Sequence, residues 1–136
     1  MKLGRAYVWN GSSWVDIGVC RNISLRGEPI NTSRDAFGRS AALAVDVTAE
    51  LTLMQADEYT LRNAIDSTSN VDLFLSFTPN PTLPSRGTTS RRETEGVILL
   101  NVSVDSTVTL DMGGGETATV VRFRTRLPHD TALSIL

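Results

Sequence analysis

Apolar and polar residues alternate most regularly between residues 43 and 53. The odd positions of this segment are all apolar, and the even positions from 46 to 52 are polar. A period of two places the two sets on opposite faces of a β-strand. Eleven residues make a strand about twice the usual length of about five or six. The polar face comprises Asp46, Thr48, Glu50 and Thr52, and the apolar face comprises Leu43, Val45, Val47, Ala49, Leu51 and Leu53.

The two ends of the chain also predict strands. Asn10-Gly11 separates two strand-like runs, which is a strong hairpin signal, and it places Trp9 and Trp14 on either side of the turn. Apolar residues recur at even positions from 98 to 110, which indicates one long strand, or two strands bent near Asp105-Ser106. The last strand, 117–127, changes its apolar parity at Val120-Val121, as a β-bulge would.

One helix and two long loops complete the pattern. Residues 55–66 have apolar side chains spaced for one helix face and acidic residues in the first turn. Residues 27–40 and 78–92 lose all periodicity and are rich in Gly, Pro, Ser and Arg, so we expect loops there. The prediction is therefore one mainly β domain over residues 1–136, a bent two-sheet sandwich or flattened barrel of seven or eight strands with one short α-helix.

Composition agrees with a folded domain in an aqueous compartment. The chain has 136 residues, of which 40% are hydrophobic and 21% charged, and its net charge of −2 gives no basic excess for nucleic-acid binding. Cys20 is the only cysteine, so no intrachain disulfide is possible, and we expect a reducing environment. No apolar run approaches the roughly 20 residues of a membrane helix, and we expect no membrane anchoring.

The chain offers little for catalysis or metal binding. His129 and Cys20 are the only residues of their types, and no pair of them has metal-ligand spacing. No lysine follows Gly113-Gly114-Gly115, so it does not match a phosphate-binding loop. Asp46 and Glu50 would stand about 13 Å apart on one strand, too far for paired acid–base work. We therefore predict a protein that is not an enzyme, with no catalytic residue, cofactor or metal.

Three arginines form a stripe on one face of the last predicted strand. Arg122, Arg124 and Arg126 alternate with Val121, Phe123 and Thr125. Such a stripe could track phosphates, but exposed aromatic residues do not interleave with it. We favour pairing with carboxylates on a neighbouring strand or subunit, because the guanidinium fork binds a carboxylate at two points. Twelve arginines against one lysine, Lys2, also favour ordered contacts.

The order of elements resembles that of bacteriophage tail tube proteins, which share a layout with the tube proteins of contractile tails and of type VI secretion. An N-terminal hairpin, a long loop, and a long amphipathic strand running into a short helix carry the resemblance. Residues 47–57 (VTAELTLMQAD) are similar to the strand-to-helix passage of that family, and the final strand ends in FRTRLP at residues 123–128. The resemblance covers nearly the whole chain as an order of elements.

The resemblance implies a virion structural protein. It implies hexameric rings, with an inner wall built from strands of all six subunits, that stack into a channel for DNA. The partners would be further copies of the chain and other tail proteins such as the tape measure and the terminator. The protein would be made in the host bacterial cytoplasm and end in the virion tail. In that setting we expect Asp46, Thr48, Glu50 and Thr52 to face the lumen, Asn31, Arg34 and Phe37 to make ring-to-ring contacts, and Arg122, Arg124 and Arg126 to lie at subunit contacts.

Two alternatives remain open at the level of sequence. The first is another ring protein of the virion, such as a tail terminator or a head–tail joining protein, which forms single rings. The second is a monomeric β-sandwich module that binds carbohydrate or peptide. That module requires exposed aromatic residues around a groove, for which Tyr7, Trp9 and Trp14 are the candidates.

Overall fold

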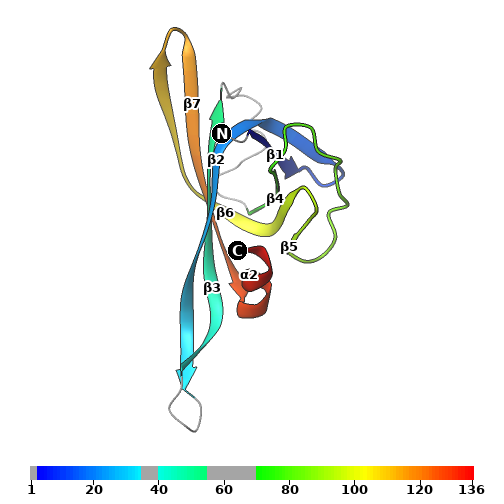
Figure 1. The fold of residues 1–136 in the computed structure, drawn as a ribbon, viewed down its shortest axis with the longest axis vertical. Coiled ribbons are helices and arrows are strands. Elements are labelled where there is room, and N and C mark those ends of the chain that lie inside the picture. Colours follow the sequence, from blue (N-terminus) through cyan, green and yellow to red (C-terminus); the bar gives the residue numbers. More distant parts are fainter. Residues whose placement is uncertain (1–2, 35–39, 55–69) are drawn as a thin grey trace.

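The computed structural model describes residues 3–34, 40–54 and 70–136. Within these residues the chain forms seven strands and one helix (Figure 1). No described helix has the length and apolar character needed to span a membrane. The elements are β1 (Gly4–Trp9), β2 (Trp14–Arg34), β3 (Ser40–Met54), β4 (Val71–Ser76), β5 (Arg91–Arg92), β6 (Gly96–Gly113), β7 (Glu116–Pro128) and α2 (His129–Ile135).

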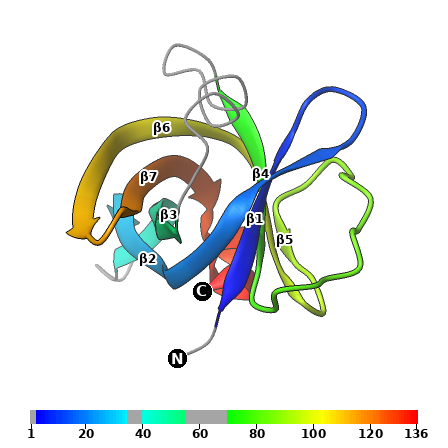
Figure 2. The same ribbon diagram turned by 90° about the horizontal axis from the view of Figure 1, so that it is seen from above.

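The strands form one antiparallel sheet that closes on itself. Their order is β4-β1-β2-β3-β7-β6-β5, and a further pairing of β4 with β6 closes the ring, which is visible from above in Figure 2. Strand β6 contributes to this closure in two parts, because residues 96–102 pair with β4 and residues 103–113 pair with β7. The structure therefore confirms the predicted mainly β, barrel-like fold with one short helix.

The core fills the inside of this barrel. The odd residues of β3 from 45 to 53 are all buried, as their alternation predicts. They meet Val121 and Phe123 of β7, and Leu73 and Leu75 of β4, in one apolar cluster. Full burial of one such side chain stabilises a fold by about 1.5–3 kcal/mol, so this cluster fixes which face of each strand points inward.

Two long hairpins extend beyond the barrel at its opposite ends (Figure 1). Strands β2 and β3 stay paired as far as Arg34 and Ser40, and β6 and β7 stay paired as far as Gly113 and Glu116. The prediction of a loop over residues 27–40 is therefore wrong for most of its length. The composition is misleading because, among the described residues, this stretch of β2 pairs with β3 alone, and such an edge position tolerates Pro29. Asn31 and Arg34 belong to β2, and Phe37 lies outside the described residues.

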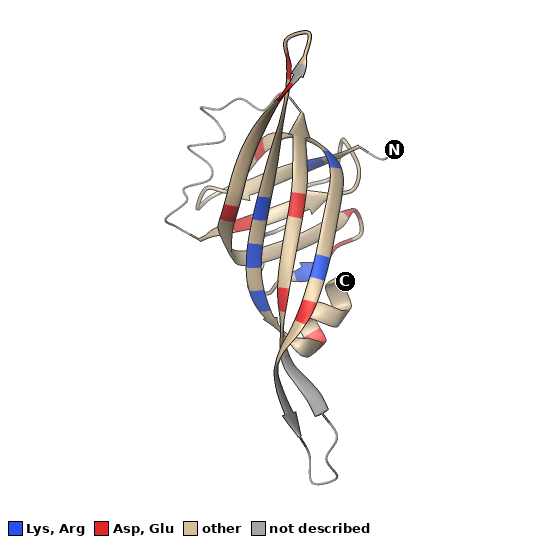
Figure 3. Cartoon of the chain, turned by 90° about the vertical axis from the view of Figure 1, so that its left-hand side faces the viewer, with Lys and Arg blue, Asp and Glu red and all other residues tan. Residues whose placement is uncertain are grey.

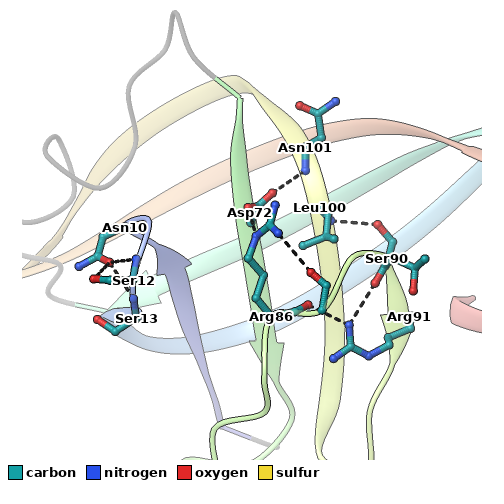
Figure 4. Close-up of polar contacts among 11 residues, drawn as sticks. Asn10, Ser12, Ser13, Asp72, Arg86, Ser90, Arg91, Leu100 and Asn101 are labelled. Atoms are coloured by element: carbon teal, nitrogen blue, oxygen red, sulfur yellow. Dashed lines mark hydrogen bonds and ion pairs between the residues drawn. The ribbon is translucent and has the colours of Figure 1, made fainter.

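The N-terminal hairpin and the second loop follow the sequence predictions. Trp9 pairs with Trp14 across the turn, with ring centroids 5.2 Å apart. The Asn10 side chain accepts hydrogen bonds from the backbone N–H groups of Ser12 and Ser13, which holds the turn (Figure 4). The loop expected over 78–92 is irregular as far as Ser90, and its last two residues form β5.

Arginines fasten the second loop to the barrel (Figure 4). Arg86 donates to the Asp72 carboxylate at 2.6 Å, and Arg91 donates to the backbone carbonyls of Arg86 and Ser85 at 2.9 and 2.8 Å. Trp14 donates its indole N–H to the carbonyl of Pro84. The loop thereby covers a small aromatic cluster on the outside of the barrel, made of Tyr7, Trp14, Phe74 and Ile98.

Three details of the strands and helices differ from the sequence predictions, lie outside the described residues, or were not predicted. Strand β7 passes Val120-Val121 without a bulge. A register shift lies instead between Val104 and Ser106 of β6, opposite Phe123 and Arg122, where a bend was one of the two predictions. The helix predicted over 55–66 lies outside the described residues. Helix α2 was not predicted; it covers one end of the barrel with Ala132 and Ile135 in the core.

Candidate functional site

The outward side of β2, β3, β7 and β6 carries a belt of charged side chains, here called the charged face (Figure 3). It exists because the buried odd residues of β3 force the even residues outward. The pairing of β3 with β7 then sets Glu50 opposite Arg122, Thr48 opposite Arg124, and Asp46 opposite Arg126. The two polar stripes found in the sequence therefore lie side by side.

The best-formed ion pair of the charged face joins Arg122 to Glu50. The Arg122 Nε and Nη2 atoms donate to Glu50 Oε2 at 3.1 and 2.7 Å. This hydrogen bond, together with the charge of Glu50 and, to a smaller degree, of Asp105, raises the pKa of Arg122. The pair stays solvent-accessible, so it orients the two side chains more than it stabilises the fold.

The lower part of the charged face gathers around Asp46. Its carboxylate lies 3.3 Å from Arg126 Nε and 3.9 Å from Arg124 Nη2. On its other side Asp46 faces Glu28 of β2, and two carboxylates opposite each other would repel without the arginines. Arg124 and Arg126 remain 53% and 62% exposed, so both keep donors available to a further partner.

This geometry bears on the residues singled out from sequence. The arginines pair with carboxylates on a neighbouring strand, which confirms one of the two pairings we favoured. The expected division into two surfaces does not hold, because the predicted lumen set and the predicted subunit-contact set share one face. Sequence reasoning missed four exposed charges on the same face, Arg21, Arg26, Glu28 and Asp105, because they do not alternate regularly with apolar residues. They are found through the register, which aligns Arg21 with Thr52 and Arg26 with Thr48.

The four-stranded sheet that carries the charged face has two open edges. Beyond Cys20, β2 pairs with β3 but with no other strand among the described residues. From Ser103 to Gly113, β6 pairs with β7 but likewise with no other strand of the described part of the chain. Both edges begin at a register shift next to an asparagine of positive φ, Asn22 in β2 and Asn101 in β6. We call residues 21–34 and 103–113 the free edges.

The rest of the described structure offers little that could do chemistry. Burial raises the pKa of the Cys20 thiol to about 12, so it is not a nucleophile near neutral pH. His129 is partly exposed and lies beside Asp130. Within residues 3–34, 40–54 and 70–136, no three His, Cys, Asp or Glu side chains cluster as a metal site would require. A shallow hollow of about 370 Å³ is lined by Phe74, Pro84 and Glu95, among others.

Comparisons with protein-family models, with curated proteins and with solved structures return no match. The charged face and the two free edges are therefore the features on which a functional proposal rests.

Proposed function

We propose that the chain is a structural subunit that joins edge to edge with further copies of itself into rings, and that these rings stack into the tail tube of a phage virion. The observation that carries this proposal is the pair of free edges on the four-stranded sheet of β2, β3, β7 and β6. Unpaired strand edges invite pairing with other chains, and a closed ring satisfies every edge without uncontrolled aggregation.

The strand directions suit such a ring. Neighbouring strands alternate in direction from β2 through β3 and β7 to β6. Strands β2 and β6 therefore run in opposite directions. If β6 of one copy met β2 of the next, the new pair would be antiparallel, and the alternation would continue around the whole ring. A head-to-tail contact of this kind closes into a ring when the rotation between copies is right.

The shape of the molecule favours placing the charged face toward the axis. The barrel body, α2 and the second loop all lie on the other side of the long sheet (Figure 1). Copies joined through the sheet would crowd on that bulky side, so the thinner side turns inward. The wall of the channel would then include Asp46, Thr48, Glu50 and Thr52 together with the paired arginines. The carboxylates of Glu50 and Asp46 offset part of the arginine charge, which weakens attraction to passing phosphates and suits transit of DNA.

The long hairpin of β2 and β3 supports stacking of rings. It extends from one end of the molecule, and the hairpin of β6 and β7 extends from the other end (Figure 1). Asn31 and Arg34 belong to the far part of β2, and Phe37 lies outside the described residues, so the role of all three in ring-to-ring contact stays a prediction. A terminator or joining ring would use the same free edges but would not stack.

A monomeric binding module is less well supported. Tyr7 and Trp14 are buried under the second loop, with 8% and 9% of their surfaces exposed, and Trp9 packs edge-on against Trp14. An aromatic binding groove would need these rings to be open to solvent.

The oligomeric mass of the purified chain tests the proposal. Light scattering coupled to size-exclusion chromatography should show closed rings, expected as hexamers, and higher stacks as the protein concentration rises. A strictly monomeric protein at millimolar concentration would contradict the proposal.

A further inference from the structure

The prevailing sign of charge on the charged face changes from strand to strand, with Glu28 of β2 and Glu116 at the far end of β7 as exceptions. The outward charges of β7 are basic, and those of β3 are acidic, and the two columns pair within the chain. On the two outer strands the order continues (Figure 3). Strand β2 presents the exposed Arg21 and Arg26. Strand β6 presents the exposed Asp105, whose charge contributes to the raised pKa of Arg122.

The two free edges are therefore complementary in charge as well as in direction. One acidic residue, Asp105, lies on the β6 edge of the sheet, and two basic residues, Arg21 and Arg26, lie on the β2 edge together with Glu28. Copies placed side by side would continue the alternation that Glu50 and Arg122 follow inside the chain. Like charges opposite one another would be unfavourable, so the pattern also opposes joining β2 to β2 or β6 to β6.

We infer that β6 of one copy pairs with β2 of a second copy, with Asp105 opposite Arg26. This contact, here called the seam, rests on the proposed ring and specifies which residues of neighbouring copies meet. It aligns Ser103 with Glu28 and Asp105 with Arg26 in antiparallel register, up to the register shift between Val104 and Ser106 of β6, and both segments lie inside the free edges. It also covers Val108 and Leu110, which are 52% and 46% exposed in the single chain.

Other registers fit the two edges less well. If Asp105 faced Arg21, the residues after it on β6 would meet Cys20, where β2 already pairs with β1. The remaining option is an arginine near the end of the hairpin, Arg34. Arg34 pairs with Ser40 of β3. Ser40 lies ten residues along β3 from Glu50. Glu50 is aligned across the sheet with Arg122 and Ser106, and Ser106 is next to Asp105 in β6.

The Arg26 and Arg34 registers would tilt the strands differently. Four strands span about 19 Å. Arg26 pairs with Thr48, two residues from Glu50, and this shift of about 7 Å corresponds to a tilt of about 20°. The shift of ten residues for Arg34 spans about 33 Å and corresponds to about 60°. Both values lie outside the roughly 35–45° of closed barrels by a similar amount, so we base the seam on Arg26, which is exposed and lies well inside the free edge.

A disulfide between the two positions tests the seam directly. In one chain β2 and β6 are separated by β3 and β7, so Asp105 and Arg26 lie about 14 Å apart across the sheet. Cysteines with Cα atoms more than about 7 Å apart cannot bridge, so any bridge must join two copies. The variant Asp105→Cys/Arg26→Cys, assembled and then oxidised, should give a ladder of linked copies on a non-reducing gel. The matched control Glu116→Cys/Arg26→Cys, with its first cysteine at the far end of the same hairpin, should give none.

A charge exchange supplies the second readout. Asp105→Arg and Arg26→Asp should each raise the protein concentration needed for assembly by roughly tenfold or more, and the double exchange should restore it. Glu116→Arg changes the same hairpin away from the seam and should have no effect. Thermal melts of each variant establish that it folds.

The outcomes separate the seam from the proposed function. Suppose the unmodified chain forms rings, but the double cysteine variant does not cross-link or the double charge exchange does not restore assembly. This result would overturn the seam and leave the ring proposal standing. A chain that never assembles would overturn both.

Discussion

At the residue scale, two asparagines mark the points where the barrel opens into the free edges. Asn22 and Asn101 have φ values of 54° and 58°, in the left-handed region that most side chains avoid. Asn101 also donates its backbone N–H to Asp72 at 2.8 Å (Figure 4). Its side-chain oxygen accepts a hydrogen bond from Asn70. The bend in β6 is therefore stabilised by hydrogen bonds that bring in residues about thirty positions away along the chain.

Substitution of Asn101 tests this bend. Asn101→Ala should lower the free energy of unfolding by about 1–2 kcal/mol, because alanine is strained at this φ and loses the contact with Asn70. Asn101→Gly should lose less, since glycine adopts the conformation freely. Urea denaturation of both variants measures the difference. Equal losses in the two variants would show that the backbone conformation carries no strain.

Cys20 gives a prediction about pH. Burial raises the pKa of its thiol from 9.0 to about 12, so the folded chain keeps a proton that the unfolded chain releases above pH 9. The unfolded state then binds fewer protons, and stability falls as pH rises between about 9 and 12, by on the order of 1 kcal/mol per pH unit. Chemical denaturation from pH 8 to 11 should show a steeper loss in the wild type than in Cys20→Ala. Parallel slopes would contradict this assignment.

At the scale of elements, α2 and the β2–β3 hairpin are fitted to each other through a glycine. A β-carbon added at Gly27 would lie 2.9 Å from Val45 Cγ1 and would also collide with the Leu136 side chain that follows α2. Arg92 of β5 further holds the helix by donating to the carbonyl of Ile135 at 3.0 Å. The helix therefore supports the base of the hairpin.

Gly27→Val tests that fit. We expect a loss of about 1–3 kcal/mol in the free energy of unfolding, because the added methyl groups overpack this contact. Leu136→Ala in the same chain should recover part of the loss by making room. Thermal unfolding of the single and double variants measures the coupling. Additive effects would mean that Leu136 does not rest on Gly27.

The elements also show what sequence patterns can and cannot predict. The period of two in β3 identified its buried face correctly, because burial on one side dictates alternation. Residues 27–34 gave no such signal. Residues 27–29 are exposed, and the hydrogen bonds to β3 make the segment a strand. The apolar parity of β7 changes at Val120-Val121 because Val120 belongs to an outward apolar surface with Val108 and Leu110. In the sequence this surface looks like a β-bulge. The charged face could not be predicted from the sequence, because it depends on the register between strands, and the pattern of a single strand does not contain that register.

At the scale of the whole molecule, the barrel is a self-contained core from which a long sheet extends. The core satisfies its own strands through the closure of β4 on β6, whereas residues 21–34 and 103–113 are left with open sides within the described chain. A monomer could bury its core without these extensions. We propose that their purpose is contact with further copies, through the seam at the sides and the hairpins at the ends.

Electron microscopy of the concentrated protein tests this claim most directly. The account predicts rings with a continuous β-walled channel in which β6 of each copy adjoins β2 of the next, and stacks of these rings at higher concentration. Isolated particles of single-chain size, or rings joined through the second loop with residues 21–34 and 103–113 left open to solvent, would contradict it.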